Sequence, residues 1–191
     1  MATSQARDRL LAAAVTQALH GGIADLSLRE LAAAIGTSHR MLIYHFGSRE
    51  GLLAAVTRQV EERERAALLG SALTIDDARA AWRRLSDPSL WPQERLFFEL
   101  YAHALLGRPG TAEFLAGIVE NWVVPLAAAQ MDSGVDERTA RADARLGLAV
   151  VRGLLLDLLA TKDRAGVDDA HERFIQLATA AMAVPDQQAT A

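Results

Sequence analysis

The segment from Ser27 to Arg49 contains side chains whose chemistry suits contacts with duplex DNA. The guanidinium groups of Arg40 and Arg49 can each donate two hydrogen bonds, to a guanine edge or to a phosphate. The Tyr44 hydroxyl and the His45 imidazole are neutral donors that suit phosphate oxygens. Further polar or adaptable candidates in this segment are Ser27, Arg29, Thr37, Ser38, His39 and Met41. For Arg40 the alternative is a solvated surface arginine, for His45 a ring that binds free carbonyls at a helix end, and for Met41 simple packing.

Two short helices joined by a tight turn would position these side chains. Ser27 and Glu30 have the spacing of a capping box, in which each side chain accepts a hydrogen bond from the other's free backbone N–H. Gly36 suits the left-handed conformation that ends a helix, and Ser38 can cap the next one. The apolar positions that recur at helical spacing are Leu28, Leu31, Ala32 and Ile35, then Leu42, Ile43 and Phe46. The pattern predicts helices over 27–34 and 38–46, arranged as a helix-turn-helix whose second helix enters the major groove by its N-terminal end.

The segment TSHRMLIYHFGSREGLL resembles the signature of TetR/AcrR-type transcriptional regulators, with Tyr44, His45 and Phe46 at its centre. The preceding LSLRELAAAIG resembles the first helix of the same module, and the likeness covers roughly residues 5–60. The resemblance implies that Tyr44 and His45 contact phosphate and that Arg49 replaces the usual lysine. Ile43 replaces a common aromatic residue. The resemblance further implies a homodimer that binds a palindromic operator, with a small-molecule pocket in the C-terminal part.

Composition limits the class of protein. The 191 residues are 51% hydrophobic and 23% charged, with five prolines and no cysteine, which favours an all-α globular protein without disulfides. The formal charge is +2 for residues 1–60 and −6 for the remainder, so the relative positive excess lies on the candidate DNA-binding part. No apolar run reaches the ~18 residues of a membrane span. From this we expect a cytoplasmic protein with no membrane partner.

Periodicity and helix-breaking residues predict the remaining elements. A long helix over 48–69 should bridge a helix-turn-helix DNA-binding domain, residues 1–50, and a helical ligand-binding and dimerisation domain, residues 51–191. Further helices are expected over 4–20, 75–86, 92–107, 111–131, 137–162 and 168–183, and a frayed tail at the C-terminus. Pro125 should kink the helix over 111–131, because it removes a hydrogen bond.

Seven of the ten aromatic residues fall between residues 82 and 122, a concentration that could line an apolar ligand cavity. The candidate lining residues are Trp82, Phe97, Phe98, Tyr101, His103, Trp122 and Arg152, with Glu99 and Asn121 as further polar anchors. Enlarging Ala102 to tryptophan is expected to fill the cavity. The alternative for each of these residues is an ordinary core position or a surface pair.

Arg152 interrupts the most apolar helix, and a buried arginine is costly unless it is paired. It could pair with an acid across a dimer interface, bind an acidic ligand group, or extend to water. The same helix carries small residues that permit close helix approach, and with the last helix it could form half of an intersubunit four-helix bundle.

These features predict a DNA-binding transcriptional regulator, a repressor released from a palindromic operator by a small apolar or amphipathic ligand. The alternative is a DNA-binding regulator with no small-molecule effector, either constitutive or controlled by a protein partner. The sequence has no phosphate-binding glycine loop, zinc motif or nucleophile elbow. We therefore expect no enzymatic activity, no catalytic residues, no cofactor and no metal.

Overall fold

Nine α-helices follow one another along the chain in a computed structural model that describes residues 2–21, 23, 25–70 and 73–183. They are α1 (Ala2–Gly21), α2 (Leu28–Ala34), α3 (His39–Phe46), α4 (Arg49–Leu69), α5 (Ile75–Leu85), α6 (Trp91–Leu105), α7 (Glu120–Asp132), α8 (Glu137–Thr161) and α9 (Arg164–Ala183). Two 3-10 helices, Pro88–Leu90 and Ala112–Phe114, lie between them. The described residues form no strand, so the prediction of an all-α fold is confirmed.

Helix caps set the boundaries in the N-terminal part. The Ser27 side chain accepts a hydrogen bond from the Glu30 N–H, and Glu30 accepts one from the Ser27 N–H, which is the predicted capping box. Ser38 caps α3 by accepting from the Met41 N–H at 3.2 Å. Ser48 caps α4 by accepting from Gly51 at 2.9 Å. Each cap satisfies a backbone donor that the first turn of a helix leaves without a partner.

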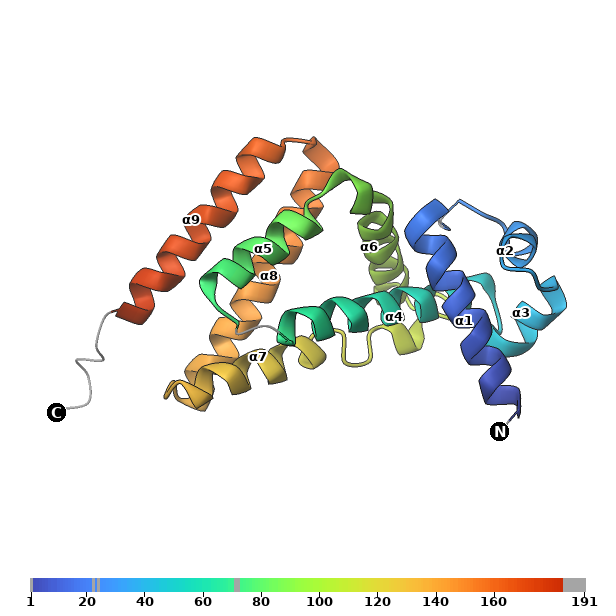
Figure 1. Cartoon of the computed structure of the whole chain (residues 1–191), viewed down its shortest axis with the longest axis horizontal. Helices are drawn as coiled ribbons and strands as arrows, with labels where there is room; N and C mark the ends of the chain where they lie inside the picture. Colours follow the sequence, from blue (N-terminus) through green and yellow to red (C-terminus); the bar gives the residue numbers. More distant parts are fainter. Residues whose placement is uncertain (1, 22, 24, 71–72, 184–191) are drawn as a thin grey trace.

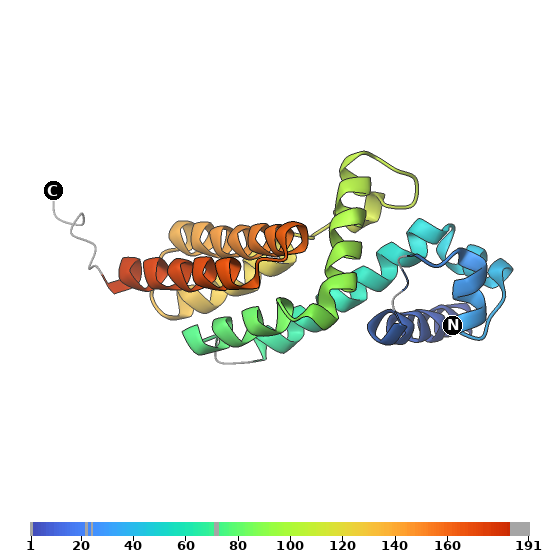
Figure 2. The same ribbon diagram turned by 90° about the horizontal axis from the view of Figure 1, so that it is seen from above.

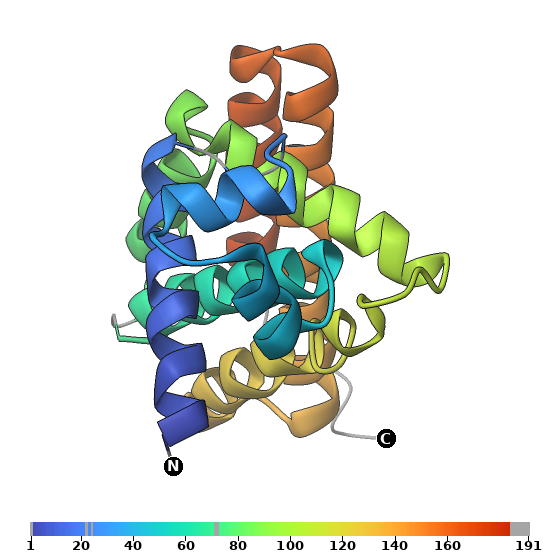
Figure 3. The ribbon, with the colours of Figure 1, turned by 90° about the vertical axis from the view of Figure 1, so that its right-hand side faces the viewer.

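Helix α4 connects the unit formed by α1, α2 and α3 to the remaining helices (Figure 1). Leu52, Leu53 and Val56 of its first half are buried in a core that also contains residues of α1 and α2. The same core continues into α6 through Leu96 and Leu100. One continuous core therefore joins the helix-turn-helix, α4 and α6. From the right-hand side of the molecule, α2 and α3 lie in front of α4, with α1 beside them (Figure 3).

A second group of helices surrounds the far half of α4. Helices α8 and α9 lie side by side and antiparallel, and α5 packs near them (Figures 1 and 2). Side-chain hydrogen bonds join α5 to α9: Arg79 binds Glu172 through Nε and Nη2 at 2.9 and 2.7 Å, and the Trp82 Nε1 donates to Asp168 at 2.7 Å. Helix α7 packs along α8 through a core of Val123, Ala127, Ala140 and Ala144.

Three details differ from the sequence-based expectations. Residues 111–131 are not one helix: a 3-10 turn and an irregular stretch precede α7, and Gly117 takes a φ of +74° that interrupts helical geometry. Helix α9 begins at Arg164, four residues before the expected start. Ile43 does not belong to the buried stripe of its helix, because its side chain is 40% exposed. The expected frayed tail lies outside the described residues.

None of the helices in the described part of the chain is long and apolar enough to cross a membrane.

Candidate DNA-binding surface and ligand cavity

Helix α3 presents an exposed surface of mixed chemistry. Leu42 is fully buried and anchors the helix, whereas Tyr44 is 68% exposed and Met41 and Ile43 are also exposed. His39 and Arg40 are exposed in the first turn, the end that a helix-turn-helix directs at base edges. Exposed apolar groups beside a tyrosine and an arginine are unusual on a plain solvated surface, and they suit contacts to thymine methyl groups and to the backbone.

His45 is less accessible than its neighbour. Its ring lies edge-on to Tyr44 with centroids 4.9 Å apart, and its Nε2 atom is buried with no hydrogen-bond partner among the described residues. The Nδ1 atom is therefore the ring nitrogen that a phosphate oxygen could reach. A contact from His45 would need the neutral tautomer with the proton on Nδ1, or the protonated ring.

Several predicted contact residues also hold the module together. The Arg49 Nε donates to the Leu26 carbonyl at 2.8 Å, which ties the start of α4 to the loop before α2. Ser27 and Ser38 have their hydroxyl groups engaged in the caps of α2 and α3. Arg29 and Thr37 lie on α2 and in the turn that follows it, and Arg29 is exposed. Arg29, His39, Arg40 and Tyr44 are the exposed donors among the predicted contact residues whose side chains do not cap a helix.

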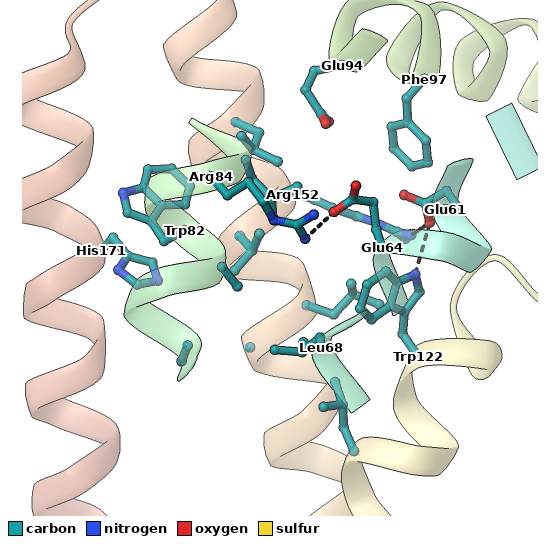
Figure 4. Close-up of a pocket in the computed structure, with 18 of the residues that line it drawn as sticks. Glu61, Glu64, Leu68, Trp82, Arg84, Glu94, Phe97, Trp122, Arg152 and His171 are labelled. Atoms are coloured by element: carbon teal, nitrogen blue, oxygen red, sulfur yellow. Dashed lines mark hydrogen bonds and ion pairs between the residues drawn. The ribbon is translucent and has the colours of Figure 1, made fainter. Parts of the chain in front are cut away.

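A cavity of about 260 Å³ lies between the far half of α4 and the helices around it (Figure 4). Of the seven side chains predicted to line it, five do so: Trp82, Phe97, Phe98, Trp122 and Arg152. The structure places Tyr101 and His103 elsewhere. Tyr101 packs against Phe114 with ring centroids 6.4 Å apart, and His103 lies near the end of α6. Glu99, Asn121 and Ala102 are exposed and also lie outside the lining, so filling the cavity through Ala102 was a wrong expectation.

Arg152 has its partners within the same chain. Its Nη2 donates to the Ile118 carbonyl at 2.8 Å and lies 3.5 Å from Glu61 Oε2. Its guanidinium carbon also lies 5.1 Å from the centre of the Phe97 ring, in cation–π geometry. Burial lowers the pKa of Arg152 from its usual value, and Glu61 opposes that shift. These contacts replace the sequence-based alternatives of an intersubunit pair or a side chain extended to water.

Carboxyl groups from three helices line the cavity: Glu61 and Glu64 of α4, Glu94 of α6 and Asp143 of α8. Glu61 accepts a hydrogen bond from Trp122 Nε1 at 2.9 Å, and Glu64 forms an ion pair with Arg84. Glu94 comes from α6 on the opposite side and directs its carboxyl group toward Glu61 and Glu64 (Figure 4). Burial, together with the charges of Glu61 and Glu64, raises the pKa of Glu94 to about 8. Burial also raises the pKa of Glu61.

Sequence reasoning missed most of this polar lining. Glu61 and Glu64 belong to the segment RQVEERERAALLG, whose charges suggest a solvated surface, and only the packing of α7 and α8 buries their face. His171 also lines the cavity and stacks on Trp82 with ring centroids 4.8 Å apart. Burial lowers the pKa of His171. The three-residue spacing of Glu61 and Glu64 puts them on one helical face, and this was the one signal available.

Among the described residues, no group of three or more His, Asp or Glu side chains is placed to hold a metal ion.

Comparisons with known proteins agree with this geometry. Residues 10–56 match the family model of bacterial regulatory proteins, tetR family. A putative TetR-family transcriptional regulator from Rhodococcus sp. is 24% identical, over 93% of this chain and 98% of that one, with a TM-score of 0.67. The multidrug binding protein EbrR, complexed with proflavin, is 28% identical over 87% of this chain and 98% of its own, with a TM-score of 0.60. A putative transcriptional regulator from Saccharomonospora viridis, in complex with choline, is 22% identical over 91% and 96% of the two chains, with a TM-score of 0.63. A comparison with curated proteins found no match.

The capped helix-turn-helix on a long connecting helix defines a DNA-binding transcriptional regulator. The N-terminal region of the chain is similar to the DNA-binding region of tetR-family regulatory proteins, and the whole chain shares its fold with structural relatives that include TetR-family regulators.

Proposed function

We propose that this protein is a repressor that binds a palindromic operator as a homodimer and releases it when a small apolar or amphipathic molecule enters the cavity. Residues 1–50 act as the DNA-binding domain, and residues 51–191 bind the ligand and dimerise. The observation that carries the proposal is that a single helix, α4, connects the helix-turn-helix to the cavity. The helix begins with Arg49 beside the helix-turn-helix, and it lines the cavity with Thr57, Val60, Glu61, Glu64 and Leu68.

A second connection joins the cavity to the start of α4. Helix α6 lines the cavity with Glu94 and Phe97, and the loop after α6 returns to the N-terminus of α4. At Gly110 in that loop, an added Cβ would lie 2.5 Å from Ser48 Oγ, the atom that caps α4. A ligand that displaces α6 would therefore shift the cap of α4 and, with it, the recognition helix α3, which directly precedes that cap in the chain. Such a ligand acts only through its difference in affinity for the two states, typically about 1–3 kcal/mol.

Structural relatives support a small-molecule effector. EbrR is described as a multidrug binding protein and was determined with proflavin, and the S. viridis regulator was determined with choline. The alternative, a regulator without an effector, would be favoured by a tightly packed C-terminal half. The cavity of about 260 Å³, lined by aromatic and carboxyl side chains, favours the ligand-controlled function instead.

The exposed face of α8 and α9 supports the proposed homodimer. Small or apolar residues recur at three- and four-residue intervals along the solvent side of α8, namely Leu146, Ala149, Gly153, Leu156 and Ala160. Leu177 is exposed on the neighbouring α9. A contiguous apolar face of this kind is a typical interaction site. Phe174, in contrast, lines the cavity from the inner side of α9.

The test is to select operator sequences from random duplex DNA and then to titrate a library of small hydrophobic compounds against the protein–operator complex. Compounds that bind the protein should lower operator affinity at least fivefold. Gly147→Leu should abolish the response with operator affinity retained, because Gly147 lines the cavity and its nearest neighbour, Phe174, lies 3.9 Å from the position of an added Cβ. Ala102→Trp, an enlargement at an exposed position outside the lining, is the matched control. If every compound that binds leaves operator affinity unchanged, the effector-free alternative takes the place of this proposal.

A further inference from the structure

Charged groups are distributed unevenly around the cavity. Four acids line it, Glu61, Glu64, Glu94 and Asp143, against two bases, Arg84 and Arg152. Arg84 pairs with Glu64, and Arg152 lies beside Glu61. His171 adds no charge at neutral pH, since burial lowers its pKa. Both arginines thus form their ion pairs with acids on α4, and their charges act on Glu94 only as weaker, more distant influences.

Glu94 is the unusual member of this group. Glu94 is only 8% exposed. Within the described residues no hydrogen bond or ion pair engages its carboxyl group, and the charges of Glu61 and Glu64 act on it more strongly than those of Arg152 and Arg84. The carboxyl group points across the cavity, and the Phe97 ring projects beside it from the same helix (Figure 4). A buried carboxyl group without a partner is destabilising, because it loses hydration and gains no hydrogen bond in return. Its position at a cavity wall leaves room for a ligand to supply the missing partner.

Aromatic rings line the same cavity as this carboxyl group. Phe97, Phe98, Trp82, Trp122 and Phe174 all line the cavity. The faces of such rings carry partial negative charge and attract cations, as the position of Arg152 over Phe97 already illustrates. Carboxylates and ring faces together favour a positive charge on an apolar body, and they disfavour an anion.

We propose that the cavity binds a monovalent organic cation with an aromatic or apolar body, and that the carboxylate of Glu94 is its counter-charge. This inference rests on the proposed function, since it names the chemical class of the effector. The cation replaces the missing partner of Glu94, and its apolar body fills the space between the aromatic side chains. Cation binding then requires Glu94 to be ionised.

The affinity of the cavity for a cation should depend on pH, because binding is linked to the ionisation of Glu94. Because the pKa of Glu94 is raised to about 8, the group is mostly protonated at pH 6 in the empty protein. A bound cation favours the ionised form, so the affinity for a cation rises as the pH increases toward the pKa. The other groups that face Glu94 do not reverse this sign. Glu61 also gains negative charge as the pH rises, His171 only loses positive charge, and Arg84 and Arg152 stay charged.

The experiment compares two probes with the same tricyclic frame, 10-methylacridinium, a permanent cation, and 10-methylacridone, which is neutral. Equilibrium dialysis uses full-length protein in the absence of DNA. At pH 8 the cation should bind at least tenfold more tightly than the neutral probe. The affinity for the cation should fall more than tenfold between pH 8 and pH 6. Glu94→Gln should remove both the preference and the pH dependence while leaving the neutral probe unaffected. Glu99→Gln, an exposed residue on the same helix outside the lining, is the matched control and should behave as wild type.

The proposal is overturned by equal affinity of the wild type for the two probes, or by cation binding that is independent of pH and unchanged in Glu94→Gln. Tighter binding of the neutral probe at low pH would also overturn it, because Glu94 would then act as a protonated hydrogen-bond donor. None of these results bears on the repressor function itself, because that function is tested by the release of operator DNA by any bound compound.

Discussion

Arg40 is the side chain on which sequence discrimination should depend most directly. It is exposed in the first turn of α3, and no described residue forms a hydrogen bond or an ion pair with its guanidinium. Arg40→Ala should weaken operator binding by about 1–3 kcal/mol and relax the preference at one base position, if Arg40 contacts a guanine. Arg83→Ala, which removes an exposed arginine from the end of α5, should leave both properties unchanged. Fluorescence anisotropy with a set of singly substituted operators measures the two effects separately, and an unaltered base preference in Arg40→Ala would contradict the assignment.

Arg49 should have two separable roles at the start of α4. Its Nε–H bonds the Leu26 carbonyl at 2.8 Å, and its charge lies at a helix N-terminus, where phosphate is favoured. Arg49→Ala should therefore lose about 1 kcal/mol of stability as well as DNA affinity. Arg49→Gln keeps an N–H donor but no charge, so it should be closer to wild type in thermal unfolding. Both variants should show a shallower salt dependence of DNA binding. Equal salt slopes for wild type and Arg49→Gln would exclude a phosphate contact.

At the scale of elements, the loop after α6 should transmit the ligand signal to α4. Gly110 has a φ of +83° and approaches Ser48, whereas Gly107 has a φ of +66° and has open space around it. Alanine at either position is disfavoured by the positive φ, at a cost of about 1 kcal/mol. Only Gly110→Ala should also displace the loop from the cap of α4. Gly110→Ala should change ligand-induced release of operator severalfold, and Gly107→Ala should not. Similar release curves for the two variants would indicate that coupling runs through α4 alone.

At the scale of the whole molecule, dimerisation decides whether two recognition helices can bind one operator. Half-sites one helical turn apart, about 34 Å, require two copies of α3 held at a fixed spacing. Gly153→Arg and Leu177→Arg place charges on the exposed face of α8 and α9, and each should yield monomers with poor operator affinity. Asp169→Arg, at another exposed position of α9, distinguishes loss of the apolar face from a general effect of added charge. Light scattering at micromolar concentration provides the mass, and a monomeric wild type would rule out the proposed assembly.

The sequence alone was sufficient to predict the helix-turn-helix, the fold class and most helix boundaries. Helices α2, α3 and α4 each begin with a serine whose hydroxyl accepts a hydrogen bond from the backbone N–H three positions later. These interactions can be recognised from local spacing. The aromatic cluster between residues 82 and 122 likewise indicated where a cavity would lie. It could not show that Tyr101 packs outside the lining, because the direction of a side chain depends on which neighbouring helix buries it.

Only the tertiary structure decided the chemistry of the cavity. Arg152 contacts Glu61, which lies 91 residues away along the chain. The sequence contains many acidic residues and does not indicate which of them is the partner. The ionisation of Glu94 is likewise set by the burial of its carboxyl group and by Glu61 and Glu64 on another helix. Short-range hydrogen bonds determine where a helix begins, whereas burial and charge coupling depend on segments that meet only when the chain has folded.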